Sequence, residues 1–486
     1  MKTVIYNIGT LAGILPADVR KLEGAQMNHV ECIENAYLVI EDGIIAEFGK
    51  MSESVILNGT NGHVILNETK DPVILNGTKW SEESLGERSF ADAQDDNKGR
   101  QEDNKGRQED NKGRQEDNKE RQEDNRRQEE NRRQDDKIEY IDAKGGFVLP
   151  AFCDSHTHIV YAGCRDGEFR DKIAGLSYEE IAARGGGILN SADLLHETSE
   201  DELYEQAMVR VREIMAMGTG AVEIKSGYGL TVEDELKMLR VIKRIKETAS
   251  ITVKANFLGA HAVGRAYRGR QAEYVDLVCN EMLPKVAEEG LADYVDVFCD
   301  AGFFTVEETA RILEKAANYG IRPKIHANEL EVSGGVQVGV RYNALSVDHL
   351  EKTTDEEIEV LRGSETMPTM LPGCSFFLGL PYGRAKDYIE AGLPVALASD
   401  YNPGSSPSGN MRFVMALGCI KMRLTPEQSL NACTINSAYA MGVSDILGSI
   451  TVGKKANLII TKPVPSLAFI PYSHQTPVIE KVILNK

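Results

Sequence analysis

Histidines at the ends of predicted β-strands are the residues of this chain best suited to chemistry. His156 and His158 belong to the segment Asp154-Ser-His-Thr-His158, which follows an apolar run. Alternate residues of a strand point to the same side, so the two imidazoles can bind one metal ion. A lone His-x-His pair is a weak signal, because two buried, hydrogen-bonded histidines would produce it as well.

Other histidines and one aspartate fall at comparable places along the chain. Of the nine histidines, five lie at predicted strand ends, and an aspartate follows the last strand. The six residues are His156, His158, His261, His326, His349 and Asp400. Imidazoles combined with a carboxylate suit zinc, and they suit ferrous or manganous ions nearly as well. A metal ion held in this way activates water near neutral pH, which predicts metal-assisted hydrolysis.

The elements that would position these residues alternate between β-rich runs and amphipathic helical stretches. We predict strands at 147–154, 221–225, 252–258, 294–299, 323–326, 345–348, 366–371 and 395–399. Helical patterns between them include 201–217, 232–247, 271–289 and 306–318. Strands that alternate with helices in this way predict an α/β fold, a parallel (β/α)8 TIM barrel. Reactive residues of such barrels lie at the C-terminal strand ends, where the histidines fall.

Both ends of the chain predict strands that do not belong to the barrel. Residues 37–49 are typical of a hairpin, and 453–461 and 478–484 are typical of strands. We expect the two flanks to pair as one small β-domain beside the barrel. In chain order the parts of this β-domain would be 1–51, 137–146 and 446–486, and the barrel would occupy 147–445.

One region, 52–136, differs in composition from the rest. The motif Val55-Ile-Leu-Asn-Gly-Thr60 recurs twice with a nine-residue period, once with Glu for Gly, and Gln101-Glu-Asp-Asn-Lys-Gly-Arg107 then recurs with a period of seven. No apolar residue occurs from Asp95 to Asp136. A seven-residue period without apolar a and d positions cannot form a coiled coil. We therefore predict a disordered low-complexity insertion that interrupts the β-domain.

The composition restricts the partners and the location. The chain has 75 acidic and 55 basic residues and a net charge of −20, which argues against a nucleic-acid partner. It has no run of 18 apolar residues and no convincing signal peptide, so we expect no membrane partner and a cytoplasmic location. Eight scattered cysteines predict reduced thiols. The oligomeric state stays open, with a homodimer as one candidate.

The set of strand-end ligands resembles the amidohydrolase superfamily, and the resemblance covers essentially the whole chain outside the insertion. It implies one divalent or trivalent metal ion per subunit, zinc or iron. The ligands would be His156, His158, His326 and Asp400. The mononuclear type is the better match, since Lys225 is the only strand-end lysine that could serve as a carbamate bridge.

Further segments narrow the resemblance to the imidazolonepropionase family. They are His158-Ile-Val-Tyr-Ala-Gly-Cys-Arg165, Tyr178-Glu-Glu-Ile-Ala-Ala-Arg-Gly-Gly-Gly-Ile188, Glu223-Ile-Lys-Ser-Gly-Tyr-Gly-Leu230, Phe257-Leu-Gly-Ala-His261, His326-Ala-Asn-Glu329 and Ser399-Asp-Tyr-Asn-Pro-Gly-Ser405. The implied reaction is hydrolysis of the ring amide of 4-imidazolone-5-propanoate to N-formimidoyl-L-glutamate, in histidine catabolism, with water as the only co-substrate. The family's usual Pro-Gly-Phe is Pro150-Ala151-Phe152 here, which implies a slight backbone adjustment.

The resemblance also assigns roles to individual positions. The residues that would contact the substrate are Arg165, Tyr178, Tyr228, His261, Glu329, Asn402, Gly404 and Ser405. Arg165 would bind the propionate, since a guanidinium fork matches a carboxylate. Glu329 would hold and deprotonate the attacking water, and His349 would orient that water or stabilise the developing oxyanion.

Two other functions stay open at this point. A related deaminase of a cyclic amidine or nucleobase would share the ligands, Glu329 and His349, but it has no use for a propionate-binding Arg165. The deaminase would release ammonia, whereas hydrolysis of 4-imidazolone-5-propanoate opens a ring. A scaffold protein that has lost catalysis would be expected to lack metal ligands, which are all present here. For single residues plainer explanations exist: Arg165 could form a surface ion pair, and Tyr228 could belong to an ordinary turn.

Overall fold

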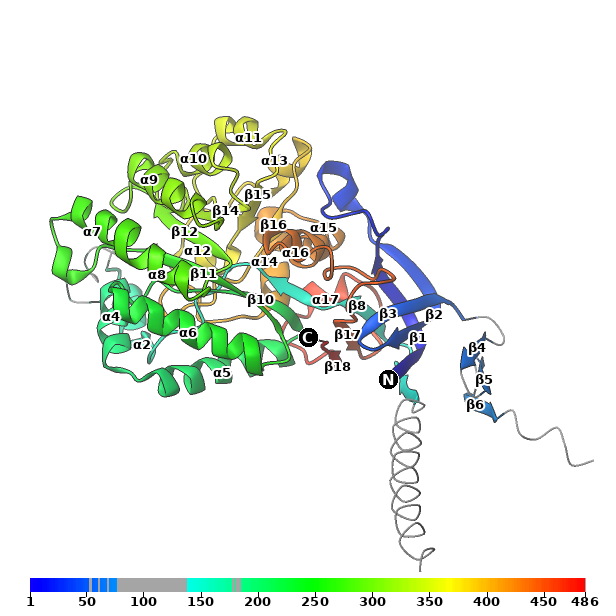
Figure 1. The fold of residues 1–486 in the computed structure, drawn as a ribbon. Helices are drawn as coiled ribbons and strands as arrows, with labels where there is room; N and C mark the ends of the chain where they lie inside the picture. Colours follow the sequence, from blue (N-terminus) through cyan, green and yellow to red (C-terminus); the bar gives the residue numbers. More distant parts are fainter. Residues whose placement is uncertain are drawn as a thin grey trace, which may run out of the picture.

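Eight parallel strands in chain order form a barrel in the computed structural model of the chain (Figure 1). The structure describes residues 1–51, 55–59, 62–67, 70–76, 138–176, 180, 184 and 186–485. The barrel strands are β9 (Phe152–Asp154), β10 (Thr219–Lys225), β11 (Thr252–Ala260), β12 (Tyr294–Cys299), β13 (Arg322–Ala327), β14 (Ser346–His349), β15 (Met367–Met370) and β16 (Ala396–Leu397). Each strand pairs in parallel with the next, so all of them end at the same rim. The predicted (β/α)8 barrel is confirmed.

The predicted strand at 147–154 is wrong in its extent. This run forms two strands, β8 (Phe147–Pro150) and β9. β8 pairs with β1 (Lys2–Ile14) and β17 (Leu458–Thr461) outside the barrel, whereas β9 pairs with β10. A continuous apolar run cannot show that the chain passes from one sheet into another, because both sheets bury it.

The first and last barrel strands are joined beyond their own ends. Among the described residues β9 and β16 share no ladder. Instead, the amide of Asp400 donates to the carbonyl of His156 (3.0 Å), and the amide of His158 donates to the carbonyl of Tyr401 (2.9 Å). The closure of the barrel therefore holds the segment with two candidate histidines against the segment that carries Asp400.

Helices cover the outside of the barrel and connect its strands (Figure 1). In chain order they are α2 (Asp166–Ile173), α4 (Ile188–Glu197), α5 (Glu200–Ala216), α6 (Val232–Thr248), α7 (Gln271–Leu277), α8 (Leu283–Glu288), α9 (Val306–Ala317), α10 (Gly335–Arg341), α11 (Asp355–Leu361), α12 (Pro372–Leu378), α13 (Ala385–Glu390), α14 (Met411–Met422), α15 (Pro426–Cys433), α16 (Ile435–Ala440) and α17 (Phe469–Tyr472). The helices predicted at 201–217, 232–247 and 306–318 are confirmed as α5, α6 and α9. The helix predicted at 271–289 consists of α7, a π-helical turn (Val278–Met282) and α8 in series.

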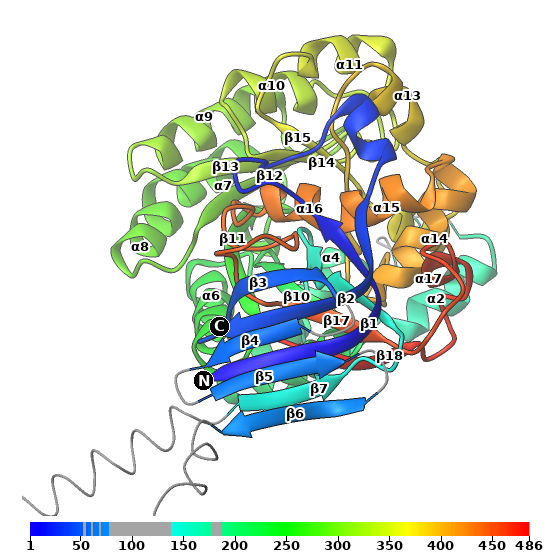
Figure 2. The ribbon, with the colours of Figure 1, turned by 90° about the vertical axis from the view of Figure 1, so that its right-hand side faces the viewer.

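A second sheet of seven strands lies beside the barrel and joins the two ends of the chain (Figure 2). Its order is β18–β17–β8–β1–β2–β3, with β7 also paired to β1. The bounds of its remaining strands are β2 (Glu31–Glu41), β3 (Ile44–Lys50), β7 (Ile138–Asp142) and β18 (Ile479–Ile483). Its core contains buried aliphatic side chains from both ends of the chain, such as Leu38 and Leu458. The predicted small β-domain built from the flanks is therefore confirmed.

The predicted insertion leaves this sheet after β3 and returns to it at β7. Within the insertion the structure describes three antiparallel strands, β4 (Val55–Gly59), β5 (Gly62–Asn67) and β6 (Lys70–Asn76). Each strand contains one copy of the Val-Ile-Leu-Asn motif, and β-branched residues favour strands. Here the structure differs from the expected disorder. The rest of the predicted insertion lies outside the described residues.

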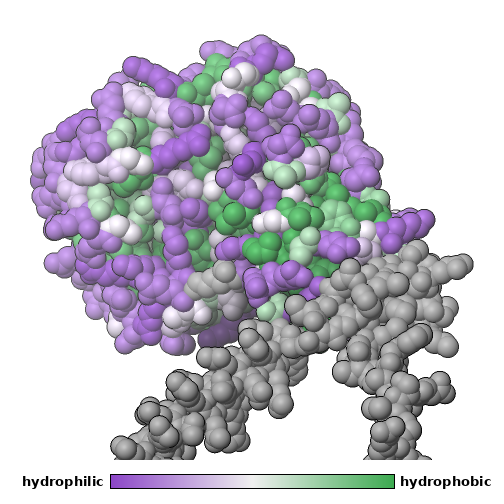
Figure 3. Space-filling view, turned by 45° about the vertical axis from the view of Figure 1, so that its right-hand side comes forward, coloured by the Kyte–Doolittle hydropathy of each residue, from purple (hydrophilic) through white to green (hydrophobic). Residues whose placement is uncertain are grey.

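No helix in the described part of the chain is long and apolar enough to span a membrane. Hydrophilic residues occupy most of the face drawn in Figure 3, with smaller groups of hydrophobic residues between them. The exposed apolar side chains include Ile173, Ile420 and Tyr472. Singly exposed apolar residues are ordinary on protein surfaces.

We predict that the insertion can be removed without loss of function. Replacing 52–136 by a Gly-Ser linker of about a dozen residues should join β3 to β7, which run parallel to each other with β2 and β1 between them. Loop-closure entropy changes by only about 0.6 kcal/mol per doubling of length, so the free energy of unfolding should change by less than about 2 kcal/mol. Steady-state kinetics should give a kcat/KM within about threefold of the full chain. A deletion variant that folds but is inactive would show that the insertion takes part in catalysis or assembly.

Candidate active site

The candidate residues gather at the C-terminal ends of the barrel strands, around a cavity of about 500 Å³. This volume lies in the range of small-molecule sites. The candidate residues that line it are His158, Arg165, Tyr228, His261, His326, Glu329, His349, Asp400, Asn402, Gly404 and Ser405. His156 is fully buried beside His158 and His326. Tyr178 lies outside the described residues.

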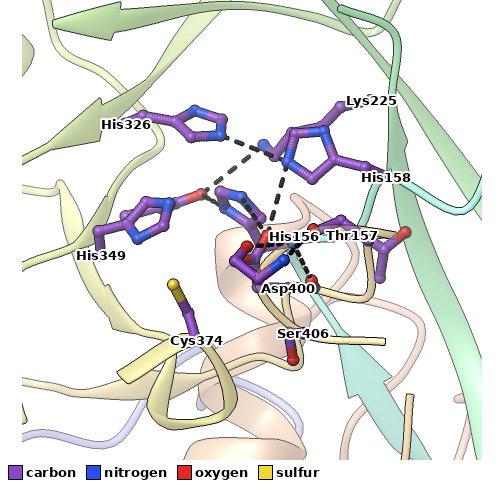
Figure 4. Close-up of polar contacts among 12 residues, drawn as sticks. His156, Thr157, His158, Lys225, His326, His349, Cys374, Asp400 and Ser406 are labelled. Carbon is purple, nitrogen blue, oxygen red and sulfur yellow. Dashed lines mark hydrogen bonds and ion pairs between the residues drawn. The ribbon is translucent and has the colours of Figure 1, made fainter. Parts of the chain in front are cut away.

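The ligand atoms of His156, His158 and Asp400 all lie within 4.8 Å of one another at this rim, and His326 adjoins them beside His158 (Figure 4). The Nε2 atoms of His158 and His326 are 3.4 Å apart, and Asp400 Oδ1 lies 3.6 Å from Nε2 of both His156 and His158. Two ligands of one tetrahedral zinc ion, each about 2.0 Å from it, are separated by about 3.3 Å. His156 Nε2 is buried and has no hydrogen-bond partner among the described residues. The arrangement therefore fits a single metal ion.

Two buried carboxylates orient the histidine rings. Asp348 Oδ2 lies 2.7 Å from Nδ1 of His156, and Asp296 Oδ1 lies 3.0 Å from Nδ1 of His326. Each carboxylate accepts a hydrogen bond from the Nδ1–H group, so Nε2 carries no proton and keeps its lone pair for a metal ion. Burial lowers the pKa of His156 well below its usual range and lowers the pKa of His326 to about 3. Both rings are therefore neutral near neutral pH, which is the state that metal binding requires.

These two carboxylates belong to a charged network inside the barrel. Lys225 Nζ lies 2.6 Å from Glu223 and 2.7 Å from Asp296. Lys324 pairs with Glu223 and lies 3.5 Å from Asp348. All five side chains are buried, so the loss of one partner would leave an uncompensated charge. Because Lys225 is already held by carboxylates, it is a poor candidate for a carbamate bridge.

Glu329 and His349 face each other in the cavity wall. His349 Nε2 lies 3.7 Å from Glu329 Oε2, and its Nδ1 lies 3.5 Å from Glu351 Oε2. Burial raises the pKa of Glu329, although the neighbouring His349 opposes the shift. Burial by itself would lower the pKa of His349, but the carboxylates of Glu329 and Glu351 outweigh burial and raise it. The pair thus places a carboxyl group that can exchange a proton beside a cationic imidazole.

The backbone that carries these two residues is held in an unusual conformation. Asp300, directly after β12, accepts hydrogen bonds from the successive amides of 329–331 (2.8, 2.9 and 3.1 Å). The φ angles of Asn328 and His349 are 58° and 87°. Left-handed backbone is strained for non-glycine residues and persists only where surrounding contacts enforce it. The backbone that presents Glu329 and His349 to the cavity therefore depends on surrounding contacts such as those of Asp300.

The loop after β16 is shaped by its own polar side chains. Asn402 Nδ2 donates to the carbonyl of Asp400 (2.7 Å), and Asn402 Oδ1 accepts from the amides of Gly404 and Ser405 (both 2.8 Å). The Ser405 hydroxyl donates to Asp400 Oδ2 (3.2 Å). Asn402 and Ser405 therefore position the Asp400 carboxylate as well as lining the cavity.

Arg165 is buried in the cavity wall, which excludes a surface ion pair. Its Nε and Nη2 donate to the two oxygens of Glu168 (2.9 and 2.6 Å). The expected bidentate contact with a propionate therefore cannot use this edge of the guanidinium. Its Nη1 lies against Gly404, where an added Cβ would come within 2.1 Å of it. A larger residue at position 404 would therefore require the Arg165 guanidinium to move.

Tyr228 and His261 lie side by side on neighbouring loops. His261 Nδ1 donates to the carbonyl of Gly227 (2.9 Å), and its ring stacks on His158 with centroids 5.2 Å apart. The ring of Tyr228 lies 5.4 Å from that of His261. Glu235, fully buried, accepts from the amide of Gly227 (3.1 Å) and from the amides of the two residues after Tyr228 (2.8 and 2.9 Å). Tyr228 therefore belongs to a loop tied down by a carboxylate and not to an ordinary turn.

Sequence reasoning did not identify several residues that the structure places in or under the site. They are Glu168, Lys172, Glu235, Asp296, Asp300, Lys324 and Glu351. Most of them act through partners that are distant in the chain. The sequence did contain a local signal for Lys172. Arg165, Glu168 and Lys172 are spaced by three and four residues, which places the three side chains on one helix face.

The chain is similar to known proteins over its whole length. The family model described as the amidohydrolase family matches residues 147–485. Imidazolonepropionase of Flavobacterium johnsoniae is 48% identical over 485 residues, covering 100% of this chain and 99% of that protein. Imidazolonepropionase of Christiangramia forsetii is 59% identical over 345 residues, covering 71% of this chain and 84% of that protein. Guanine deaminase of E. coli shares the fold alone, with a TM-score of 0.64 at 12% identity, covering 100% of this chain and 98% of that chain.

We predict that Asp348→Asn weakens metal binding without unfolding the barrel. An asparagine oxygen is a weaker acceptor than a carboxylate, and loss of such an outer partner costs about 10- to 100-fold in metal affinity. Competition between the metal-free protein and a chromophoric chelator measures this affinity. Glu223→Gln is the matched control, since it removes a charge from the same network that contacts Lys225 and Lys324 but no histidine. Equal losses of affinity in both variants would refute the orienting role of Asp348.

Proposed function

The chain belongs to the imidazolonepropionase family of amidohydrolases, and on that premise we propose how its residues carry out the reaction. The enzyme hydrolyses the ring amide of 4-imidazolone-5-propanoate to N-formimidoyl-L-glutamate, a step of histidine catabolism, with water as the co-substrate. The observation that carries the assignment of roles is the convergence of the three histidines and Asp400 at one rim, beside Glu329 in the same cavity.

We propose that His156, His158, His326 and Asp400 hold one ion, zinc or iron. Amidohydrolases depend on metals, and neutral imidazoles with a carboxylate suit either of these two. His349 also comes within reach of His156 and His326, but its Nε2 is directed at Glu329. A bound ion would polarise the amide carbonyl and lower the pKa of water. Elemental analysis of the purified protein distinguishes zinc from iron.

Glu329 is the proton carrier in this proposal. Its carboxylate takes a proton from the attacking water as the water oxygen bonds to the carbonyl carbon. It then gives this proton to the ring nitrogen as the C–N bond breaks. His349, held between Glu329 and Glu351, is favoured as a cation by these two neighbours. A cationic imidazole there stabilises the negative charge that develops on the carbonyl oxygen.

The remaining cavity residues would recognise the substrate. Tyr228 and His261 offer aromatic surfaces for the flat ring, and the loop from Asn402 to Ser405 would contact the ligand from the last strand. Tyr178 is kept as a proposed contact on the basis of family membership alone. A cytoplasmic location and the absence of a nucleic-acid partner remain proposals that rest on the acidic composition, and a homodimer remains one candidate for the assembly.

A product assay tests this function against the deaminase alternative. With 4-imidazolone-5-propanoate we expect loss of the ring chromophore and stoichiometric N-formimidoyl-L-glutamate, without ammonia. A chelator should stop turnover, and added zinc or iron should restore it, because the proposed reaction requires the metal ion. Release of ammonia from a cyclic amidine or nucleobase, in place of ring opening, would support the deaminase.

We predict that Glu329→Gln keeps the fold and the metal but lowers kcat by about 10²- to 10⁴-fold. The amide preserves the shape of the side chain, yet it cannot accept the proton of the water. Glu331→Gln is the control, because Glu331 shares the Asp300 contact through its amide but its exposed side chain lies outside the cavity lining. Its kcat should stay within about twofold of wild type. A fully active Glu329→Gln variant would make another group the base, with His349 the first candidate.

A further inference from the structure

Lys172 and Arg165 occupy the same stretch of the cavity wall, on α2 and just before it. Both residues line the cavity, and so does Gly404. Lys172 Nζ donates to the carbonyl of Gly404. Arg165 Nη1 lies 2.1 Å from the position that a Cβ atom of residue 404 would occupy. Two cationic side chains therefore meet at one residue of the loop after β16.

The charges on this stretch of wall do not cancel. The Arg165 guanidinium makes two hydrogen bonds to Glu168, so its charge is matched by that carboxylate. Lys172 forms no ion pair with any carboxylate in the part of the chain that the structure describes. Among the described residues of this stretch, the two cations Arg165 and Lys172 stand against the one carboxylate of Glu168, which leaves a net positive charge.

The neighbours of Lys172 hold its ammonium group in place without neutralising it. One is the carbonyl oxygen of Gly404, and the other is the ring of Phe377, whose centroid lies 4.9 Å from Nζ. An ammonium has three N–H donors, and Gly404 accepts from one of them. Within the described residues no other acceptor takes the remaining donors. They are available to a ligand in the cavity.

We propose that Lys172 is a specificity-determining residue whose ammonium binds the carboxylate of the substrate's propanoate arm. This inference rests on the proposed function, which defines the ligand. Arg165 keeps the propanoate contact proposed from family membership, and its Nη1 faces Gly404, the residue that accepts a hydrogen bond from Lys172. Lys172 adds a second attraction for the anion from the same stretch of the cavity wall. The preferred ligand class is a short carboxylate joined to a flat heterocycle.

A purely structural Lys172 is the competing explanation. In that case the ammonium would only tie α2 to the loop after β16 through Gly404. Its loss would then weaken every ligand of the cavity alike, whatever the charge of the ligand. A carboxylate-binding Lys172 would instead affect anionic ligands far more than neutral ones of the same shape.

The experiment removes the charge from the ligand and from the protein separately, as in a double-mutant cycle. The ligands are 4-imidazolone-5-propanoate and its neutral propanamide. The proteins are the metal-loaded wild type, Lys172→Met, Lys172→Arg and the control Lys421→Met. Lys421 is exposed, lies 5.8 Å from the ring of Tyr382 and does not line the cavity. We measure kcat and KM for both ligands, and Kd by calorimetry in the Glu329→Gln background, so that binding is known independently of turnover.

We expect Lys172→Met to reduce the preference for propanoate over propanamide by about tenfold or more, as for the loss of one hydrogen bond to a charged group. The change should appear in KM and Kd more than in kcat. Lys172→Arg should keep most of the preference, and Lys421→Met all of it. Lys172→Gln replaces Lys172→Met if the latter does not fold. A preference in the neutral variant within about twofold of wild type would overturn the proposal.

Failure of the proposed function gives a different pattern of results. A wild type that prefers the propanoate in binding, loses this preference in Lys172→Met, and does not open the ring would keep the subsite and overturn the function. Ring opening with a preference that Lys172→Met leaves unchanged overturns the subsite alone. Binding of neither ligand to the wild type overturns both.

Discussion

The hydrogen bond between His156 Nδ1 and Asp348, 2.7 Å long, is the interaction on which the site depends. It fixes the tautomer of the histidine and directs Nε2 toward the point where the other candidate ligands meet. A carboxylate buried so deeply needs a countercharge, and Lys324 supplies one at 3.5 Å. This lysine also pairs with Glu223, which in turn pairs with Lys225. A charged layer thus occupies a part of the barrel interior where branched apolar side chains usually pack. Ligand geometry and fold stability are therefore coupled, since a change in the layer reaches the histidines.

The site also requires that the segments after the first and the last barrel strand meet at one rim. The backbone hydrogen bonds that join the first and last strands run between the residues at His156–His158 and those at Asp400–Tyr401, so the candidate ligands themselves form the seam of the barrel. Left-handed backbone is concentrated at the same rim, with φ of 87° at His349 and 54° at Asp400. Each such residue costs about 1–3 kcal/mol and persists only when its surroundings hold it. The side chain of Asn402 holds the backbone at Asp400 in this conformation, because it donates to the Asp400 carbonyl and accepts from the amide of Gly404.

The candidate substrate contacts and the candidate metal ligands share one loop, because Asp400, Asn402 and Ser405 all follow β16 and are hydrogen-bonded to one another. His326 and His349 lie within β13 and β14, whereas Arg165 precedes α2, Lys172 lies on α2, and Gly404 lies in the loop after β16. The region at α2 can vary without disturbing the ladder of the barrel, whereas a change in the loop after β16 also reaches the Asp400 carboxylate. The predicted insertion lies in neither part, because it leaves and re-enters the small sheet.

The sequence by itself determined the barrel and the small β-domain from the two flanks, because strand periodicity is a local signal. Polar strand ends placed five histidines and Asp400 on one rim, and the family resemblance selected the candidate ligands among them. The sequence did not show that 147–154 divides between two sheets, or that the Val-Ile-Leu-Asn repeats would pair as strands. It also could not show that Glu168 occupies the fork of Arg165, or that Lys225 is held between two carboxylates. Only the tertiary structure decided these pairings. Which buried charges meet depends on the register of strands far apart in the chain and on the way the barrel closes, and no local pattern of residues encodes that geometry.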